Sequence, residues 1–147
     1  MEHVGITGTR EGPTPAQRDF LEAFFRFRVG TITLHHGCCR GVDAEAHSIA
    51  YRLGIPIVGY PPVKDDYKMV IRPEEFVELK PEAPYLTRDR DIVDAADYLV
   101  VVPKSPYIKH TGGTWYTYNY AKQVHFKKTR IIAWPNGTAT HEFIVEA

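Results

Sequence analysis

Three junctions in this sequence have the same form: a short apolar run ends, glycine follows, and a helical stretch begins soon after. The clearest is the pair Gly112 and Gly113, which follows the β-branched run at residues 98–103. Gly8 and Gly37 follow two earlier runs. Glycine lets a backbone approach a ligand closely, and the first N–H groups of a helix point unpaired at an anion. Together the junctions indicate one phosphate-binding site at the edge of a parallel sheet.

The apolar runs alternate with helical patterns along the chain. The spacing predicts strands over residues 4–9, 31–35, 55–59, 98–103 and 130–134, with a further short edge strand at 142–145. Helices are predicted from residue 15 onward and over residues 42–53, 85–97 and 115–125. Strands joined by helices need right-handed crossovers, so the pattern predicts an α/β fold with a mostly parallel five-stranded sheet and helices on both faces. In such sheets ligands bind beyond the carboxyl ends of the strands, where the strand order reverses.

The first helix has the strongest local signals. Thr14 can cap it, Pro15 suits the first helical position, and Gln17 completes a capping box. Five apolar residues follow at helical spacing: Phe20, Leu21, Phe24, Phe25 and Phe27. This stripe predicts packing against the sheet and not a cofactor site.

Residues 63–84 interrupt the alternation, because they are rich in charge and proline. The pattern predicts one short helical turn within them. Two interpretations of the segment stay open: a solvated connection, or a lid over the site.

Composition limits the range of functions. The 147 residues fit a single domain, 1–147, that needs no disulfide or metal to form a core. Its 18 basic and 18 acidic residues balance, which argues against a protein whose main task is to grip nucleic acid. Cys38 and Cys39 are adjacent and suit a reducing compartment, so we expect a cytoplasmic protein. We expect neither a secretory leader nor a membrane partner, because no apolar run is long enough.

A set of motifs in a fixed order carries a resemblance to a known superfamily. The motifs are Gly5-Ile6-Thr7-Gly8-Thr9-Arg10, His36-Gly37-Cys38-Cys39-Arg40-Gly41-Val42-Asp43, Tyr60-Pro61-Pro62, residues 85–93, and Gly112-Gly113-Thr114. With them the sequence resembles the SLOG superfamily, the Rossmann-like domains shared by Lonely-guy phosphoribohydrolases, DNA-processing protein A and the YpsA-related proteins. It is most similar to the small YspA/YpsA-related members. The resemblance implies a Rossmann-like three-layer sandwich with a pocket for a nucleotide or a nucleotide-derived molecule.

Charged residues follow the first two glycine turns. Arg10 and Arg40 each stand where a guanidinium can pair with a phosphate through two hydrogen bonds, with a plain surface position as the alternative. Asp43 stands at a predicted helix start. It is expected either to cap that helix or to accept a hydrogen bond from a ribose hydroxyl, and both roles can hold together.

Arg88 and Arg90 resemble the family's Arg-Asn-Arg signature, with Asp89 in place of the asparagine. Ion pairs with neighbouring aspartates on the same helix are the alternative role for the two arginines. The predicted ligand-binding residues are Gly8, Thr9, Arg10, Gly37, Arg40, Gly41, Asp43, Arg88, Arg90, Gly112, Gly113 and Thr114.

One position bears on catalysis. The Lonely-guy hydrolases carry a glutamate shortly after their Gly-Thr pair, and the resemblance places Thr117 there. Threonine cannot stabilise a developing positive charge as a carboxylate does. We therefore expect a binding protein, a sensor or sequestering module for a small nucleotide derivative, that requires no cofactor. Two alternatives stay open: hydrolysis of the N-glycosidic bond of a nucleoside monophosphate, and binding of single-stranded DNA as by DNA-processing protein A.

The histidines bear on whether the chain holds a metal ion, and the aromatic residues bear on whether it associates with a second copy. His35 and His36 are adjacent on a strand, so their side chains face opposite sides and cannot share a metal ion, and no metal site is predicted. The aromatic run at residues 115–120 is too dense for one buried stripe. Some of its rings are expected to face solvent, a ligand or another subunit, and we expect a homo-oligomer.

Overall fold

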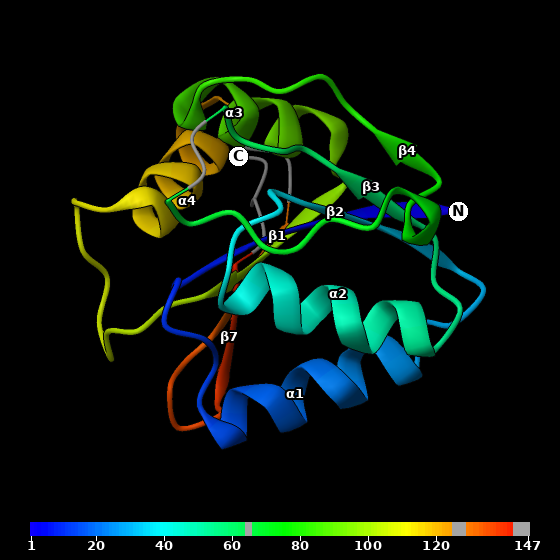
Figure 1. Ribbon diagram of the computed structural model, residues 1–147. Helices are drawn as coiled ribbons and strands as arrows, with labels where there is room; N and C mark the ends of the chain where they lie inside the picture. The colour runs from blue at the N-terminus through cyan, green and yellow to red at the C-terminus, as the bar shows by residue number, and fades with distance from the viewer. Residues whose placement is uncertain (64–65, 125–128, 143–147) are drawn as a thin grey trace.

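The computed structural model describes residues 1–63, 66–124 and 129–142, and its centre is one seven-stranded sheet (Figure 1). The strands follow the order β4-β3-β2-β1-β5-β6-β7. Their bounds are β1 (Glu2–Gly8), β2 (Ile32–His36), β3 (Ile57–Gly59), β4 (Glu78–Leu79), β5 (Tyr98–Val102), β6 (Thr129–Ala133) and β7 (Ala139–Glu142). Every neighbouring pair is parallel except β6 and β7, which are antiparallel.

Helices cover both faces of this sheet (Figure 1). They are α1 (Pro15–Arg26), α2 (Val42–Arg52), α3 (Tyr85–Ala95) and α4 (Gly113–Val124), with a short 3-10 helix, η1 (Pro73–Glu75), before β4. On the face of α1 and α2, Leu21 and Phe25 are fully buried against the sheet. On the face of α3 and α4, Trp115 and Tyr118 pack with Val101. No helix in the described ranges is long and apolar enough to cross a membrane.

The predicted α/β class is confirmed, but the sheet has two more strands than the five predicted. β4 lies within residues 63–84, close to the one helical turn expected there, and pairs with β3. β7 ends where the edge strand was predicted to begin, and residues 143–145 lie outside the described residues. Both strands are largely exposed and short, so they depend on pairing with a neighbour and carry no apolar pattern of their own.

The local signals for α1 are confirmed at its start. Thr14 and Gln17 form the capping box, each accepting a hydrogen bond from the backbone N–H of the other. The Gln17 side chain also donates to the carbonyls of Pro103 and Ala133, at 2.8 Å each, which ties α1 to the ends of β5 and β6. Phe27 was expected in the core, but it caps the carboxyl end of the helix and is 87% exposed.

The strand order reverses at β1. This strand pairs with β2 on one side and with β5 on the other, where Gly8 lies opposite Val102. After β1 the chain passes to α1 on one face, and after β5 it passes to α4 on the opposite face (Figure 1). A crevice forms at such a reversal because the two connections leave the sheet in different directions. α4 begins at Gly113, two residues earlier than predicted, and its predicted end at His125 lies outside the described residues.

Candidate ligand-binding site

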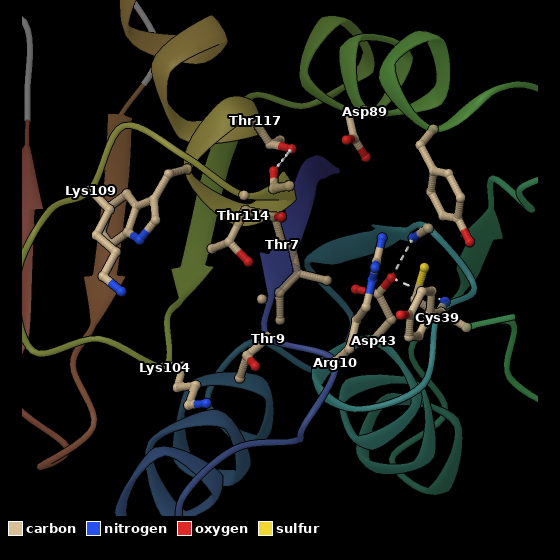
Figure 2. A pocket seen from close by; sticks show the side chains of 18 of the residues that line it. Thr7, Thr9, Arg10, Cys39, Asp43, Asp89, Lys104, Lys109, Thr114 and Thr117 are labelled. Atoms are coloured by element: carbon tan, nitrogen blue, oxygen red, sulfur yellow. Dashed lines mark hydrogen bonds between the residues drawn. The ribbon is translucent and has the colours of Figure 1, made fainter.

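A cavity of about 830 Å³ opens at the carboxyl ends of β1 and β5 (Figure 2). Its walls are the loops after β1, β2 and β5 together with the first turns of α3 and α4. Most of the predicted binding residues line it: Gly8, Thr9, Arg10, Gly37, Asp43, Arg88, Gly112, Gly113 and Thr114. The three glycine junctions found in the sequence therefore meet at one hollow.

Arg40 and Gly41 lie in the loop after β2 but do not line this cavity. The Arg40 guanidinium donates to the carbonyl of Asp66 at 2.7 Å, and its backbone N–H donates to the carbonyl of Tyr67 at 2.7 Å. Gly41 has a φ of 85°, and a Cβ there would collide with the backbone carbonyl of Thr9. Both residues serve loop packing, so the geometry does not place them against a ligand in the cavity.

Arg90 also lies outside the cavity, on the wall of a neighbouring hollow. Its Nε donates to the hydroxyl of Tyr116 at 2.9 Å. Arg88, two residues earlier on α3, lines the cavity itself. Residues two apart on a helix face different directions, which explains why the pair does not act on one wall.

Arg88 fastens α3 to the loop after β2. It is only 6% exposed, and it donates from Nη1 to the carbonyl of Gly37 at 2.9 Å and from Nη2 to Sγ of Cys39 at 3.1 Å. A Cβ on Gly37 would overlap Arg88 Nη1, so the guanidinium can lie against residue 37 only because that residue is glycine. Within the described part of the chain, Arg88 Nε has no hydrogen-bond partner. The result is a buried positive charge in the cavity wall.

Asp43 does not cap α2, because the N-cap residue is Gly41. Asp43 Oδ2 instead accepts hydrogen bonds from the backbone N–H groups of Gly37 and Cys39, each at 3.2 Å (Figure 2). Burial raises the pKa of Asp43 to about 6, although the Arg88 guanidinium and the two N–H groups act in the opposite direction. The side chain therefore shapes the loop after β2 and lines the cavity at the same time.

Asp89 and Thr117 come together in the cavity wall from α3 and α4 (Figure 2). The Thr117 hydroxyl donates to the carbonyl of Gly113 at 2.8 Å. Burial raises the pKa of Asp89 to about 6, although the Arg88 guanidinium and the nearby Thr117 hydroxyl act in the opposite direction. Position 117 holds threonine where the Lonely-guy hydrolases have a glutamate, but the carboxyl group of Asp89 lies beside this threonine in the structure.

Two cations in the cavity were missed by the sequence analysis. Lys104 and Lys109 lie in the loop between β5 and α4 and line the cavity (Figure 2). Lys104 Nζ also pairs with Glu11 at 2.8 Å. Both lysines follow the carboxyl end of a predicted strand, and that position is the signal that could have found them.

Arg10 lies against two tyrosine rings at the rim of the cavity. Its guanidinium carbon is 3.9 Å from the ring centroid of Tyr67 and 5.1 Å from that of Tyr85. The Arg88 guanidinium lies 4.9 Å from the same Tyr85 centroid. Tyr67 belongs to residues 63–84, the segment expected to be either a connection or a lid. This segment contributes β4 to the sheet, and its Tyr67 also lines the cavity.

A chain of hydrogen bonds supports the loop after β2 from behind. His36 Nδ1 accepts from the backbone N–H of Cys38 at 3.0 Å, so its Nε2 carries the proton and donates to His47 Nδ1 at 2.9 Å. His47 Nε2 in turn donates to Glu75 at 2.9 Å. Burial holds the pKa of His36 well below its usual range, so this residue stays neutral and keeps accepting from the loop.

The remaining histidines and thiols of interest have structural partners. His35 hydrogen-bonds to His3 at 2.8 Å and to the Tyr60 hydroxyl at 2.9 Å. In the described ranges, no three His, Cys, Asp or Glu side chains are grouped to hold a metal ion. Cys38 and Cys39 are free and buried, and burial raises their pKa values to about 12 and about 11. Both thiols are protonated near neutral pH and are therefore poor nucleophiles.

Solved structures with a similar fold are known. The molybdenum cofactor binding protein from Rippkaea orientalis matches with a TM-score of 0.68 over 89% of this chain and 75% of that one, at 16% identity. The Moco carrier protein from Chlamydomonas reinhardtii matches with a TM-score of 0.62 over 89% of this chain and 75% of that one, at 19% identity. DNA processing protein A from Streptococcus pneumoniae matches with a TM-score of 0.66 over 90% of this chain, at 15% identity, and this chain spans 50% of its length.

No family model and no curated protein matches the sequence of this chain. The chain has the Rossmann-like fold of the three solved structures. The Rossmann-like fold that the sequence predicted is therefore confirmed, whereas membership of the SLOG superfamily stays a prediction. At these identities the likeness shows the fold alone.

Proposed function

We propose that this protein binds a nucleotide or a nucleotide-derived ligand in the cavity at the carboxyl ends of β1 and β5. One observation carries the proposal: the first turn of α4 borders the same hollow as the cations Arg10, Lys104 and Lys109. Unpaired N–H groups at a helix start and cationic side chains are the groups with which proteins hold phosphate. The cavity volume of about 830 Å³ lies in the usual range for small-molecule sites.

The two sides of the cavity suit different parts of such a ligand. A phosphate is best placed at Gly113 and Thr114, where the N–H groups that begin α4 are free of intrahelical partners. Asp43 and Asp89, on the wall built by α2 and α3, are acceptors for a ribose hydroxyl or a base amine. At the rim the Tyr67 ring supports the Arg10 guanidinium, 3.9 Å from the ring centroid, and so helps to keep this cation beside the cavity.

Buried polar atoms give independent support. The Tyr85 hydroxyl and Arg88 Nε are buried without a hydrogen-bond partner within the described residues. Buried polar groups in proteins are nearly always satisfied, so an orphaned pair in a cavity wall suggests that a ligand or its bound water completes the site. Two of the structures with this fold are named for a small ligand, the molybdenum cofactor, which supports the same class of function.

Calorimetric titration with AMP, ADP-ribose, NAD and cyclic ADP-ribose tests the proposal. We expect saturable binding of at least one of them, and Arg10→Gln should weaken it by about 10- to 100-fold, the worth of a hydrogen bond to a charged group. Arg18→Gln is the control: this arginine on α1 pairs with Glu45 at 2.9 Å and does not line the cavity, so its loss should leave the affinity unchanged. No heat with any compound, and no ligand in a native mass spectrum of freshly purified protein, would refute the proposal.

A second candidate function is favoured by the position of Asp89. Asp89 lines the cavity next to Thr117, where it would supply the carboxylate that hydrolysis of an N-glycosidic bond requires. In that reaction water adds to the anomeric carbon, the bond to the base breaks, and the base leaves with a proton. Chromatography of AMP incubated with the protein would show adenine and ribose 5-phosphate. Asp89→Asn should then lower kcat far more than it changes KM, and an absence of products excludes this activity.

Binding of single-stranded DNA is the remaining alternative, in view of the fold shared with DNA processing protein A. The balance of 18 basic and 18 acidic residues gives it no support. Fluorescence anisotropy with a labelled oligonucleotide at low salt distinguishes it from the proposal. Affinity for the oligonucleotide that exceeds the affinity for every nucleotide tested would favour the DNA-binding function.

A further inference from the structure

A second hollow of about 560 Å³ adjoins the cavity. The two share Leu86, Gly112 and Gly113 in their walls. The second hollow is also lined by His110, by Arg90 from α3 and by Tyr116 from α4. The glycine pair therefore lies on the boundary between two hollows and not at the end of one.

Because both residues are glycine, neither places a side chain on this boundary between the two hollows. Gly112 has a φ of 94° and needs glycine for its backbone conformation. Gly113 has no such need: it begins α4 with an ordinary φ, and a Cβ there would meet no atom within 4 Å. Glycine within a helix is roughly 0.5–1 kcal/mol less favourable than alanine. Packing gives no reason for glycine at 113, whereas close passage of a ligand over the boundary does.

We propose that the ligand is a dinucleotide-type molecule, whose linking phosphates lie over Gly112 and Gly113 and whose two nucleoside parts occupy the cavity and the second hollow. This inference rests on the proposed function and specifies the class of ligand. The phosphates then meet the first N–H groups of α4, which are accessible at the boundary because neither residue has a side chain.

The second hollow has the chemistry to hold a base or a sugar. The Tyr116 ring lines it, and the hydrogen bond from Arg90 Nε to the Tyr116 hydroxyl, 2.9 Å long, restrains that ring. The Tyr120 hydroxyl donates to Asp94 Oδ1 at 2.9 Å, which restrains this second ring. Restrained aromatic rings are good stacking surfaces because little conformational entropy is lost on binding. The Asn119 side chain on the same wall offers an amide for hydrogen bonds to a base edge.

Charge favours a free dinucleotide over a segment of a long strand. On the wall formed by α2 and α3, the cavity carries the carboxyl groups of Asp43 and Asp89. Arg88, whose Nη1 lies 3.7 Å from Asp89 Oδ1, balances one of these two carboxyl groups. A strand that continued past the first nucleoside would bring its next phosphate toward the other and would be repelled. A ligand that ends in a ribose or a base places hydroxyl or amine donors there instead.

Titration calorimetry with NAD and with its two halves, AMP and nicotinamide mononucleotide, tests this inference directly. If both hollows are used, NAD should bind at least about 100-fold more tightly than either half, because the second contact becomes intramolecular. The diadenylate pApA, whose single phosphodiester replaces the pyrophosphate, distinguishes the two kinds of linkage. Either linked compound binding more tightly than its halves supports the inference, and a twelve-nucleotide DNA strand tests the alternative.

Tyr116→Ala locates the second contact. It should weaken binding of the linked compound about 10-fold, and it should leave the mononucleotide that occupies the cavity unaffected. Phe27→Ala is the control, because this ring is 87% exposed and lines neither hollow. Melting curves of both variants check that they are folded.

Five results would overturn the inference. Equal affinity for linked compounds and their halves would do so while leaving the proposed function intact, whereas the absence of binding by any nucleotide would refute both. Tighter binding of the DNA strand than of either dinucleotide, or no effect of Tyr116→Ala on a bound dinucleotide, would place the ligand elsewhere. A dimer in the native mass spectrum that dissociates in Tyr116→Ala would assign the second hollow to a subunit contact.

Discussion

Gly37 and Arg88 depend on each other although they lie far apart in the sequence. The Arg88 guanidinium donates to the Gly37 carbonyl, and it occupies the space that a Cβ at position 37 would need. Gly37→Ala should displace this buried charge from its acceptors and lower the free energy of unfolding by about 1–3 kcal/mol. Urea denaturation measures the change. Gly113→Ala is the control, and equal stability of the two variants would show that the Arg88 contact contributes nothing.

Asp43 gives the protein a pH dependence that can be worked out from its surroundings. Burial raises its pKa to about 6 from an ordinary value of 3.8. Between these values the folded protein keeps a proton that the unfolded chain has lost, so the free energy of unfolding falls as the pH rises through this range. The slope due to Asp43 is at most about 1.4 kcal/mol per pH unit. Asp89, with a pKa also raised to about 6, acts in the same direction.

Asp43→Asn should therefore flatten the decline in stability between about pH 4 and pH 6. Asparagine keeps an oxygen that can accept from the loop N–H groups, so the loop after β2 should be preserved. Urea denaturation of both proteins across this range measures the two slopes. Parallel curves would mean that Asp43 titrates normally in the folded protein.

Arg10 and Arg40 show what the sequence could not predict about the site, namely the direction in which a loop arginine points. Arg10 and Arg40 each follow a glycine turn closely, and the sequence predicted the same role for both. Arg10 lines the cavity, whereas Arg40 donates to the carbonyl of Asp66 on the outside. The difference arises from residues 66–67, which pack on the loop after β2 from a distant part of the chain. A motif predicts which loop carries a charge, but the packing of other segments decides its direction.

The start of α4 has a structural role and, under the proposed function, a binding role as well. Gly113→Ala should leave the free energy of unfolding unchanged or raise it by up to about 1 kcal/mol, since alanine favours a helix and its Cβ meets no neighbour. The same methyl group would stand where the phosphate is proposed to pass, so nucleotide affinity should fall at least 10-fold. Chemical denaturation and calorimetry measure the two effects. Unchanged nucleotide affinity in a stable variant would show that the phosphate does not bind at the start of α4.

Elements with their own local signals were predicted well, and those without were not. The capping box of Thr14 and Gln17 placed the start of α1, and the apolar runs placed β1, β2 and β5. β4 is two residues long and half-exposed, and it exists because Val77 and Lys80 donate backbone hydrogen bonds to β3. Pairing of this kind is decided by a partner strand distant in sequence, so no periodicity within residues 63–84 could reveal it.

At the scale of the whole molecule, the site depends on how the two halves of the sheet meet. The alternation of strands and helices predicted that the glycine junctions share one edge, and the structure confirms this arrangement. It did not predict that β5 lies directly beside β1, which brings Gly112 and Gly113 close to Gly8. Strand order comes from the packing of helices on opposite faces, and local pattern carries no information on it.

A ligand in this cavity would touch segments from both layers of helices, and this leads to a global prediction. Its contacts would include the loops after β1 and β2, on the side of α1 and α2, and the starts of α3 and α4 on the other side. A ligand present at 100 times its dissociation constant adds about 2.7 kcal/mol to the free energy of unfolding. For a domain of this size that should raise Tm by roughly 5–10 °C. Amide hydrogen exchange should slow on both sides of the cavity together, because the ligand bridges them. Protection confined to one layer, or a Tm that does not rise with ligand concentration, would show that the bound molecule does not span the reversal between β1 and β5.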